Sequence, residues 1–157
     1  MKIRLVVIGK TNQDWLKKGI TEYTERLKHY VSFEMLEIPD LKNKAKMSVE
    51  KLVEMEGIEL AKYMDTGADC IALDENGKEY NSIGFAGLIE KKMLEGNKQL
   101  TFIVGGAFGI SKKIMDDCRA KIALSQMTFS HQMVRLFFVE QLYRAFSIIK
   151  GEKYHHV

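Results

Sequence analysis

The feature that most constrains the fold of this chain is an alternation of two patterns. Short apolar runs are typical of buried strands, and stretches with apolar residues every three or four positions are typical of helices. Strands are expected over residues 2–8, 33–38, 70–73, 100–104 and 121–124. Helices are expected to begin at Asn12, Ser48, Ser82, Ser111 and about His131. This order predicts an α/β fold with a mostly parallel sheet and helices on both faces.

Residues between these patterns indicate where elements end. Asn12 and Ser48 are expected to be helix N-caps. Residues 41–47 have no apolar period and contain three lysines, which predicts an exposed loop. Residues Asp74-Glu75-Asn76-Gly77 are typical of a turn. The sequence contains neither an internal repeat nor a Pro/Gly/Ser linker, so residues 1–157 are expected to form a single domain.

Composition limits the classes to which the protein can belong. The chain has 157 residues, of which 46% are hydrophobic. A domain of this size can bury roughly 70% of the surface of its unfolded chain, so it needs neither disulfides nor a structural metal. Cys70 and Cys118 lie far apart in the sequence and are expected to be reduced core thiols, which favours a cytoplasmic location. The first apolar run is too short for a signal sequence or a membrane span, so no membrane partner is expected. The four histidines lack metal-ligand spacing, and no metal is expected.

Positive charge gathers near the carboxyl end. The net charge is only +3, yet residues 111–157 contain eight basic and four acidic side chains. A polyanionic partner at this end is compatible with that distribution, although the signal is weak.

A glycine-rich segment, Gly105-Gly106-Ala107-Phe108-Gly109, follows a predicted strand and precedes a helix. It matches neither the dinucleotide-binding pattern nor the Walker phosphate loop. Ligands of open α/β sheets bind at such strand ends, where glycine lets the backbone approach a flat ligand closely. The segment could equally be no more than a tight connection.

A second segment, residues 123–131, joins a predicted strand to the last helix and mixes hydroxyl groups with apolar side chains. Such a segment could enclose an adenine, with backbone groups at its edge and apolar side chains on its faces. Alternatively, Ser130 could serve only as an N-cap.

The last helix has apolar residues on nearly all sides, with Phe137 and Ile148 lying among its polar positions. One small domain cannot cover such a helix, so a homodimer is expected. Arg135 lies on an apolar side, where it should meet a carboxylate, a carbonyl group or an anionic ligand, unless it extends to solvent. Glu140 and Arg144 have the spacing of a surface ion pair, and a catalytic carboxylate is the alternative.

Residues 102–109, 124–135 and 140–145, with the ending Tyr154-His155, closely resemble the RlmH family. These are small SPOUT methyltransferases that methylate N3 of a pseudouridine in 23S ribosomal RNA. The resemblance implies S-adenosylmethionine as methyl donor, a trefoil knot in the carboxyl-terminal half, and an active site completed across a homodimer bound to the ribosome. It places the donor pocket at Leu73, Gly105, Leu124, Ser125, Gln126, Met127, Thr128 and Phe129.

The same resemblance suggests roles near the carboxyl end. Glu140 and His155 are candidates for removing the N3 proton, and the sequence does not decide between them. Arg135 and Arg144 could hold RNA phosphate or an interface carboxylate. Tyr154 could contact the extruded base when the tail folds over the site. Position 156 is His where the family usually has Arg, which makes a phosphate contact there pH-dependent or removes it.

Two other functions are compatible with the residues. One is a knotted methyltransferase acting on another RNA, such as transfer RNA, which would bind the donor but yield a different product. The other is a non-enzymatic ribosome-binding module, which would bind RNA without affinity for the donor.

Overall fold

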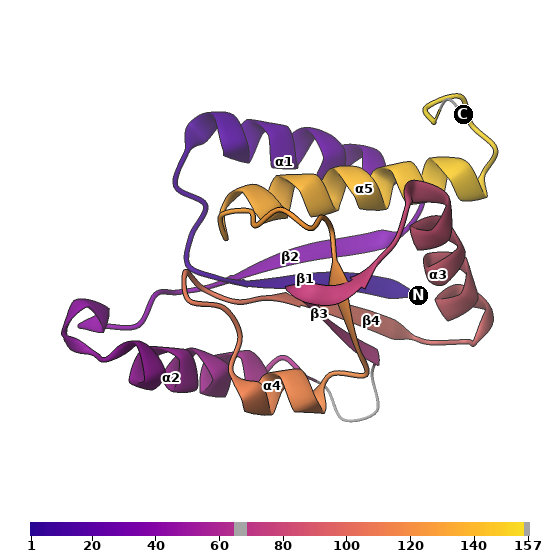
Figure 1. Ribbon diagram of the computed structural model, residues 1–157. Helices are drawn as coiled ribbons and strands as arrows, with labels where there is room; N and C mark the ends of the chain where they lie inside the picture. Colours follow the sequence, from indigo (N-terminus) through magenta and orange to yellow (C-terminus); the bar gives the residue numbers. More distant parts are fainter. Residues whose placement is uncertain (65–68, 156–157) are drawn as a thin grey trace.

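The computed structural model describes residues 1–64 and 69–155 and contains a five-stranded parallel sheet between two layers of helices (Figure 1). The strand order is β2-β1-β4-β3-β5. The strands are β1 (Lys2–Ile8), β2 (Ser32–Ile38), β3 (Asp69–Glu79), β4 (Gln99–Val104) and β5 (Ala120–Ala123). The predicted fold class is therefore confirmed, whereas the trefoil knot and the single domain stay predictions.

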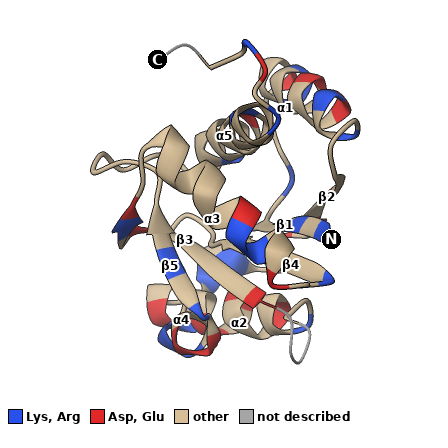
Figure 2. Cartoon of the chain, turned by 90° about the vertical axis from the view of Figure 1, so that its right-hand side faces the viewer, with Lys and Arg blue, Asp and Glu red and all other residues tan. Residues whose placement is uncertain are grey.

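Helices cover both faces of the sheet. One layer contains α1 (Asp14–Leu27), α3 (Ser82–Leu94) and α5 (Met133–Ile149), and the other contains α2 (Val49–Ala61) and α4 (Lys112–Asp117) (Figure 1). Figure 2, which colours the chain by residue type, shows acidic and basic residues together on α1, α2 and α4, in the outer layers of the molecule. Many of these charges form exposed ion pairs within one helix, such as Arg26 with Glu22.

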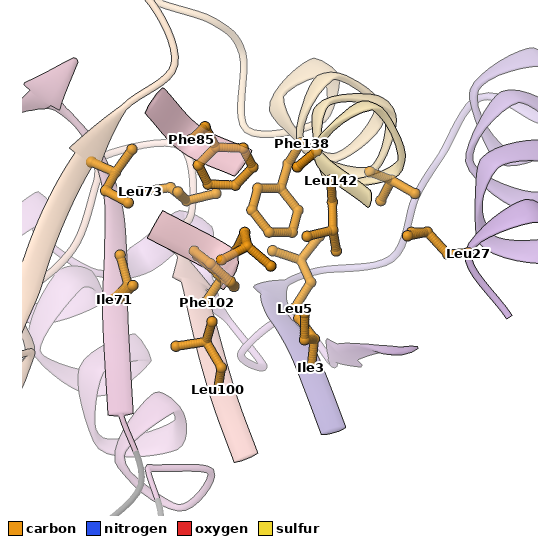
Figure 3. Packing of buried hydrophobic residues seen from close by; sticks show 14 of the residues in the cluster. Ile3, Leu5, Leu27, Ile71, Leu73, Phe85, Leu100, Phe102, Phe138 and Leu142 are labelled. Carbon is orange, nitrogen blue, oxygen red and sulfur yellow. The ribbon is translucent and has the colours of Figure 1, made fainter. Parts of the chain in front are cut away.

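Two hydrophobic cores lie on the two sides of the sheet. Alternate residues of β1 serve both: Ile3, Leu5 and Val7 belong to the larger core, and Val6 and Ile8 to the smaller one. Because both faces are covered, residues 5–8 of the strand form a continuous apolar run rather than an alternating pattern. Rings of Phe85, Phe102 and Phe138 pack together in the larger core, under α3 and α5 (Figure 3).

Most predicted elements are present, and several boundaries differ. Ser48 caps α2 as expected, because its hydroxyl accepts the N–H of Lys51, but the helix ends at Ala61 rather than near Met64. The prediction for Asn12 is wrong. Helix α1 begins at Asp14 after Gln13, and Asn12 instead donates its N–H to the side chain of Gln132. The predicted loop at 41–47 contains a short 3-10 helix, η1 (Lys44–Lys46).

The predicted turn at residues 74–77 is also wrong, because these residues lie within β3. Leu73 and Lys78 both pair with Ile122, so the four residues between them form a bulge. These residues nevertheless make a hydrogen bond typical of turns, in which the carboxylate of Asp74 accepts the N–H of Asn76. A Cβ atom at Gly77 would lie 2.5 Å from the backbone nitrogen of Ile122, which explains the glycine. Local turn signals thus became a bulge because β5 pairs with both halves of the strand.

Candidate functional site

The bulged middle of β3 and the carboxyl ends of β4 and β5 open into a cavity of about 610 Å³. This volume is within the roughly 300–1,000 Å³ typical of small-molecule sites, and the location is the one at which open α/β sheets bind ligands. Three separate parts of the chain line the cavity, namely residues 73–75, 104–110 and a set between 122 and 134.

The structure brings together nearly all residues that were predicted to hold the donor. Those lining the cavity are Leu73, Gly105, Leu124, Ser125, Met127, Thr128 and Phe129. Gln126 is the exception, since its amide points toward the carboxylate of Glu79 at 3.4 Å. Phe108 and His131 also line the cavity and belong to the two segments singled out above, whereas Asp74 and Glu75 were missed as lining residues. Their position beside predicted strand ends was the signal that could have identified them.

The glycine segment forms a tight turn that makes one wall of the cavity. Gly109 donates its N–H to the carbonyl of Gly106, and the two residues form an isolated β-bridge. A Cβ atom at Gly105 would lie 2.2 Å from the carbonyl oxygen of Gly109, so only glycine allows this close approach. The turn is thus a tight connection that also lines the cavity, which combines the two alternatives left open above.

Glu56 of α2 supports this turn from outside the cavity. A Cβ atom at Gly106 would lie 2.5 Å from the Oε2 atom of Glu56. The Glu56 side chain is buried, and its Oε2 atom has no hydrogen-bond partner among the described residues. Burial raises the pKa of Glu56, with the charge of Asp40 adding to the effect.

Residues 124–130 form the opposite wall. The hydroxyl of Ser125 accepts the N–H of Met127, and the hydroxyl of Thr128 bonds to the carboxylate of Glu75 from the β3 bulge. Ser130 accepts the N–H of Met133, the first residue of α5, although the N-cap position itself is Gln132. Ser130 therefore satisfies a free N–H of the helix end and lines the cavity at the same time.

The lining has the chemistry of a site for a nucleoside that carries positive charge. Leu124, Met127 and Phe129 can cover an aromatic base, and Asp74 and Glu75 can accept hydrogen bonds from a ribose and attract a cation. Burial and the neighbouring charge of Arg135 lower the pKa of His131, so this lining residue is neutral at neutral pH.

Arg135 lies inside the protein, not on an RNA-binding surface. Its guanidinium is fully buried and donates to the carbonyl groups of Ile8 and Gly9 and to the hydroxyl of Thr11. Its Nε atom donates to the carbonyl of His131, and Glu37 lies 3.5 Å away. The expectation that Arg135 meets carbonyl groups is confirmed. Because the side chain is fully buried, it has no exposed surface that could bind an RNA phosphate. The Arg135 side chain instead joins the end of β1 to the start of α5.

Glu140 and Arg144 of α5 form a second cluster with Tyr154 of the tail that follows this helix. Arg144 pairs with the Oε1 atom of Glu140, and the hydroxyl of Tyr154 donates to the same atom at 3.0 Å. Gln141 donates to the other carboxylate oxygen at 2.7 Å. Three donors thus occupy this carboxylate. Burial raises the pKa of Tyr154, which keeps its hydroxyl protonated as a donor.

The tail is packed against the helices as far as it is described. The Tyr154 ring packs on Tyr143 at 4.7 Å between centroids, and Glu152 bonds to the hydroxyl of Tyr30. The Nδ1 atom of His155 is buried and has no hydrogen-bond partner among the described residues. His156 lies outside the described residues. In one chain this cluster and the cavity are separate, because the described lining residues end at Val134.

The parallel sheet, the glycine turn and the second loop are the parts that the family resemblance predicted for a SPOUT methyltransferase, and comparison with known proteins supports this class. The chain matches the family described as "Predicted SPOUT methyltransferase" over residues 1–155. Two solved structures share the fold at 11% identity. They are a probable methyltransferase from Bordetella pertussis Tohama I (TM-score 0.58, covering 92% of this chain and 96% of that one) and a probable methylase family protein from Haemophilus influenzae Rd KW20 (TM-score 0.52, covering 99% and 70%).

Curated relatives narrow this class further. Proteins named ribosomal RNA large subunit methyltransferase H from Cytophaga hutchinsonii and Phocaeicola vulgatus are 50% and 49% identical to this chain. The matches cover 99% of this chain and 100% and 99% of the relatives. The chain belongs to this family, RlmH, as its motifs suggested, and is a methyltransferase that uses S-adenosylmethionine as methyl donor.

Two further features of the described residues bear on the earlier predictions. Among residues 1–64 and 69–155, His, Cys, Asp and Glu form no group of three or more that could hold a metal ion. In the same part of the chain, none of the helices is long and apolar enough to span a membrane.

Proposed function

We propose that this methyltransferase transfers a methyl group from S-adenosylmethionine to N3 of a pseudouridine in 23S ribosomal RNA of the large ribosomal subunit. The proposal rests on the similarity to proteins named ribosomal RNA large subunit methyltransferase H, which are 44–50% identical to this chain over 99% of its length. With the ribosome as substrate, the protein acts in the cytoplasm.

Residues at the strand ends would hold the donor. Leu124, Met127 and Phe129 provide apolar walls for the adenine, and Glu75 lies where it can meet polar or cationic groups of the donor. The sulfonium group of the donor supplies a methyl group that is already electrophilic. The protein therefore has to exclude water, hold N3 of the base in line with that methyl group and help remove the N3 proton, and positioning provides most of the rate.

We assign removal of the N3 proton to His155 and a positioning role to Glu140. The carboxylate of Glu140 already accepts hydrogen bonds from Tyr154, Arg144 and Gln141, which leaves it little capacity to take a proton. The Nδ1 atom of His155 has no hydrogen-bond partner among the described residues. Glu140 would then fix Tyr154 in the orientation that contacts the extruded base.

The separation of the cavity from this cluster supports a homodimeric enzyme, in which the tail of one subunit reaches the donor pocket of the other. Apolar side chains gather near the cavity. Phe108, Met127 and Phe137 are 57%, 74% and 38% exposed, and the Phe137 ring packs on Phe129 of the cavity wall. A second copy could cover these side chains and bring its own Tyr154 and His155 to the cavity.

The function is tested by mass spectrometry of RNA from cells with and without the protein. Loss of one methyl group from a pseudouridine of 23S ribosomal RNA, restored when the protein is expressed again, is the expected result. Methylation lost from transfer RNA instead would contradict the proposed substrate. A protein that associates with ribosomes but changes no RNA modification would contradict the proposed activity.

The dimer is tested separately by light scattering. Phe137→Asp should produce monomers that bind the donor weakly and are inactive, because a charge would be buried in the interface. Leu94→Asp is the matched control, since Leu94 is 82% exposed at the end of α3 and should tolerate the same change. An active, monomeric Phe137→Asp variant would rule out a site shared between subunits.

A further inference from the structure

Two cysteines that are 48 positions apart in the sequence meet in the structure. The Sγ atoms of Cys70 and Cys118 lie 3.4 Å apart. Cys70 is near the start of β3, and Cys118 follows the last residue of α4. Both side chains pack in or against the smaller hydrophobic core, on the face covered by α2 and α4. Both thiols are free, as expected for reduced core thiols, and the fold brings together two cysteines that are far apart in the sequence.

The backbone around the two sulfur atoms fixes their separation. Arg119, the neighbour of Cys118, donates its N–H to the carbonyl of Cys70 at 2.9 Å. The Arg119 side chain also bonds to the carboxylate of Asp69, the neighbour of Cys70, at 2.9 Å. Two contacts between neighbouring residues therefore join the same two segments as the thiols do. The β3–β5 pairing and these contacts therefore hold the backbones of the two cysteines close together.

The two thiols differ in acidity and access. The hydrogen bond from Cys70 lowers the pKa of Cys118, and the charge of Lys121 acts in the same direction. The same hydrogen bond and burial raise the pKa of Cys70, so this thiol stays protonated. Cys118 is half-buried, whereas Cys70 is buried. Cys118 is therefore the thiol that reacts first with a small oxidant, because the thiolate is the nucleophile.

We propose that Cys70 and Cys118 form a peroxide-reactive dithiol site, in which Cys118 is the attacking thiol and Cys70 the resolving thiol. The Cys118 thiolate attacks one oxygen of hydrogen peroxide, the O–O bond breaks, and Cys118 sulfenic acid and hydroxide form. The Cys70 sulfur then attacks the Cys118 sulfur, and the sulfenic hydroxyl leaves with the Cys70 proton as water. The proton first lost by Cys118 neutralises the hydroxide. In sum, two thiols and one peroxide yield one intramolecular disulfide and two waters.

This site would act on the fold and not on the chemistry of methyl transfer. The thiols lie near the amino end of β3 and just before β5, whereas the cavity begins at Leu73 and the ends of β4 and β5, and neither cysteine lines it. Oxidation should therefore leave donor binding nearly unchanged while it links two segments covalently. A resolving thiol in contact also prevents Cys118 from reaching the irreversible sulfinic and sulfonic states.

The test is intact-mass spectrometry of the full-length reduced protein after treatment with a small excess of hydrogen peroxide. The mass of the protein should fall by that of two hydrogen atoms, and both free thiols should disappear. Dithiothreitol should restore the mass and the thiols, and the oxidised protein should run as a monomer on a denaturing, non-reducing gel. Because the disulfide closes a long loop, the thermal unfolding midpoint of the oxidised protein should rise by at least about 3 °C. The affinity of the oxidised protein for S-adenosylmethionine should change less than about twofold.

Two serine variants separate the roles of the thiols. In Cys70→Ser, Cys118 should be labelled by a sulfenic-acid reagent and then gain oxygen atoms, because nothing resolves it. In Cys118→Ser, the buried Cys70 should remain unmodified under the same treatment. The proposal is overturned if the wild-type protein gains oxygen without forming a disulfide, if it forms only disulfides between chains, or if Cys70 in Cys118→Ser is oxidised as quickly as Cys118 in Cys70→Ser.

Discussion

Replacing Gly105 with alanine should damage the donor site by adding a single methyl group. The new Cβ atom would lie 2.2 Å from the carbonyl oxygen and 2.4 Å from the carbonyl carbon of Gly109, both of which are backbone atoms. Carbon atoms of this kind do not approach closer than about 3.0 Å, so the two sides of the turn must separate by about 0.8 Å. This backbone cannot rotate away as a side chain could.

The size of the effect follows from this displacement. Overpacking of this kind costs typically about 1–3 kcal/mol of stability. Because the displaced backbone lines the cavity, we also expect the donor Kd to rise at least tenfold, which corresponds to about 1.4 kcal/mol of binding free energy. Calorimetric titration with S-adenosylmethionine measures the affinity, and urea unfolding measures the stability.

Gly87→Ala provides the matched control. A Cβ atom at Gly87 would have no neighbour within 4 Å, and the residue lies inside α3, away from the cavity lining. This change should leave donor affinity intact and add up to about 1 kcal/mol of stability, since alanine favours helices. If Gly105→Ala remained folded and bound the donor as tightly as Gly87→Ala, the glycine turn would not be part of the donor site.

Four further variants test other parts of the structure. Arg135→Met should lower the free energy of unfolding by about 3–5 kcal/mol in urea titrations, because buried carbonyl groups lose their donor, whereas Arg26→Met on the surface should cost less than about 1 kcal/mol. Glu56→Gln should add about 1–3 kcal/mol to the free energy of unfolding at pH 7. Burial raises the pKa of Glu56 in the folded state, so the wild-type protein loses stability as the pH rises above the unfolded value of 4.5. Equal stabilities of variant and wild type at both about pH 4 and about pH 7 would contradict this. Truncation after Lys150 should leave donor affinity unchanged and reduce ribosome methylation at least about tenfold, which a full rate would refute. His155→Gln should lower kcat and change KM little in methylation assays with saturating donor. An unchanged kcat would exclude His155 as the proton acceptor.

The local patterns of the sequence were sufficient for the elements and the fold class. Strand β1 has the bounds, and helix α3 the first residue, that their patterns predicted, because apolar periodicity is a local property. The cavity in which we propose that the donor binds was largely predictable too, once family motifs identified the segments around Gly105 and Leu124. Residues 74–77 show the limit of such reasoning, since their turn signals are genuine but pairing with β5 turns them into a bulge.

Local patterns and motifs were thus enough to predict the order of strands and helices, the family and many residues of the cavity at the strand ends. Packing in three dimensions was needed to show that Arg135 is buried against carbonyl groups more than 120 positions away, and that Cys70 meets Cys118. It also decided that Glu140 and Tyr154 lie together but apart from the cavity of their own chain. The physical reason is that such contacts depend on how layers pack across the sheet, and the residues that make them are brought together only when distant segments become neighbours.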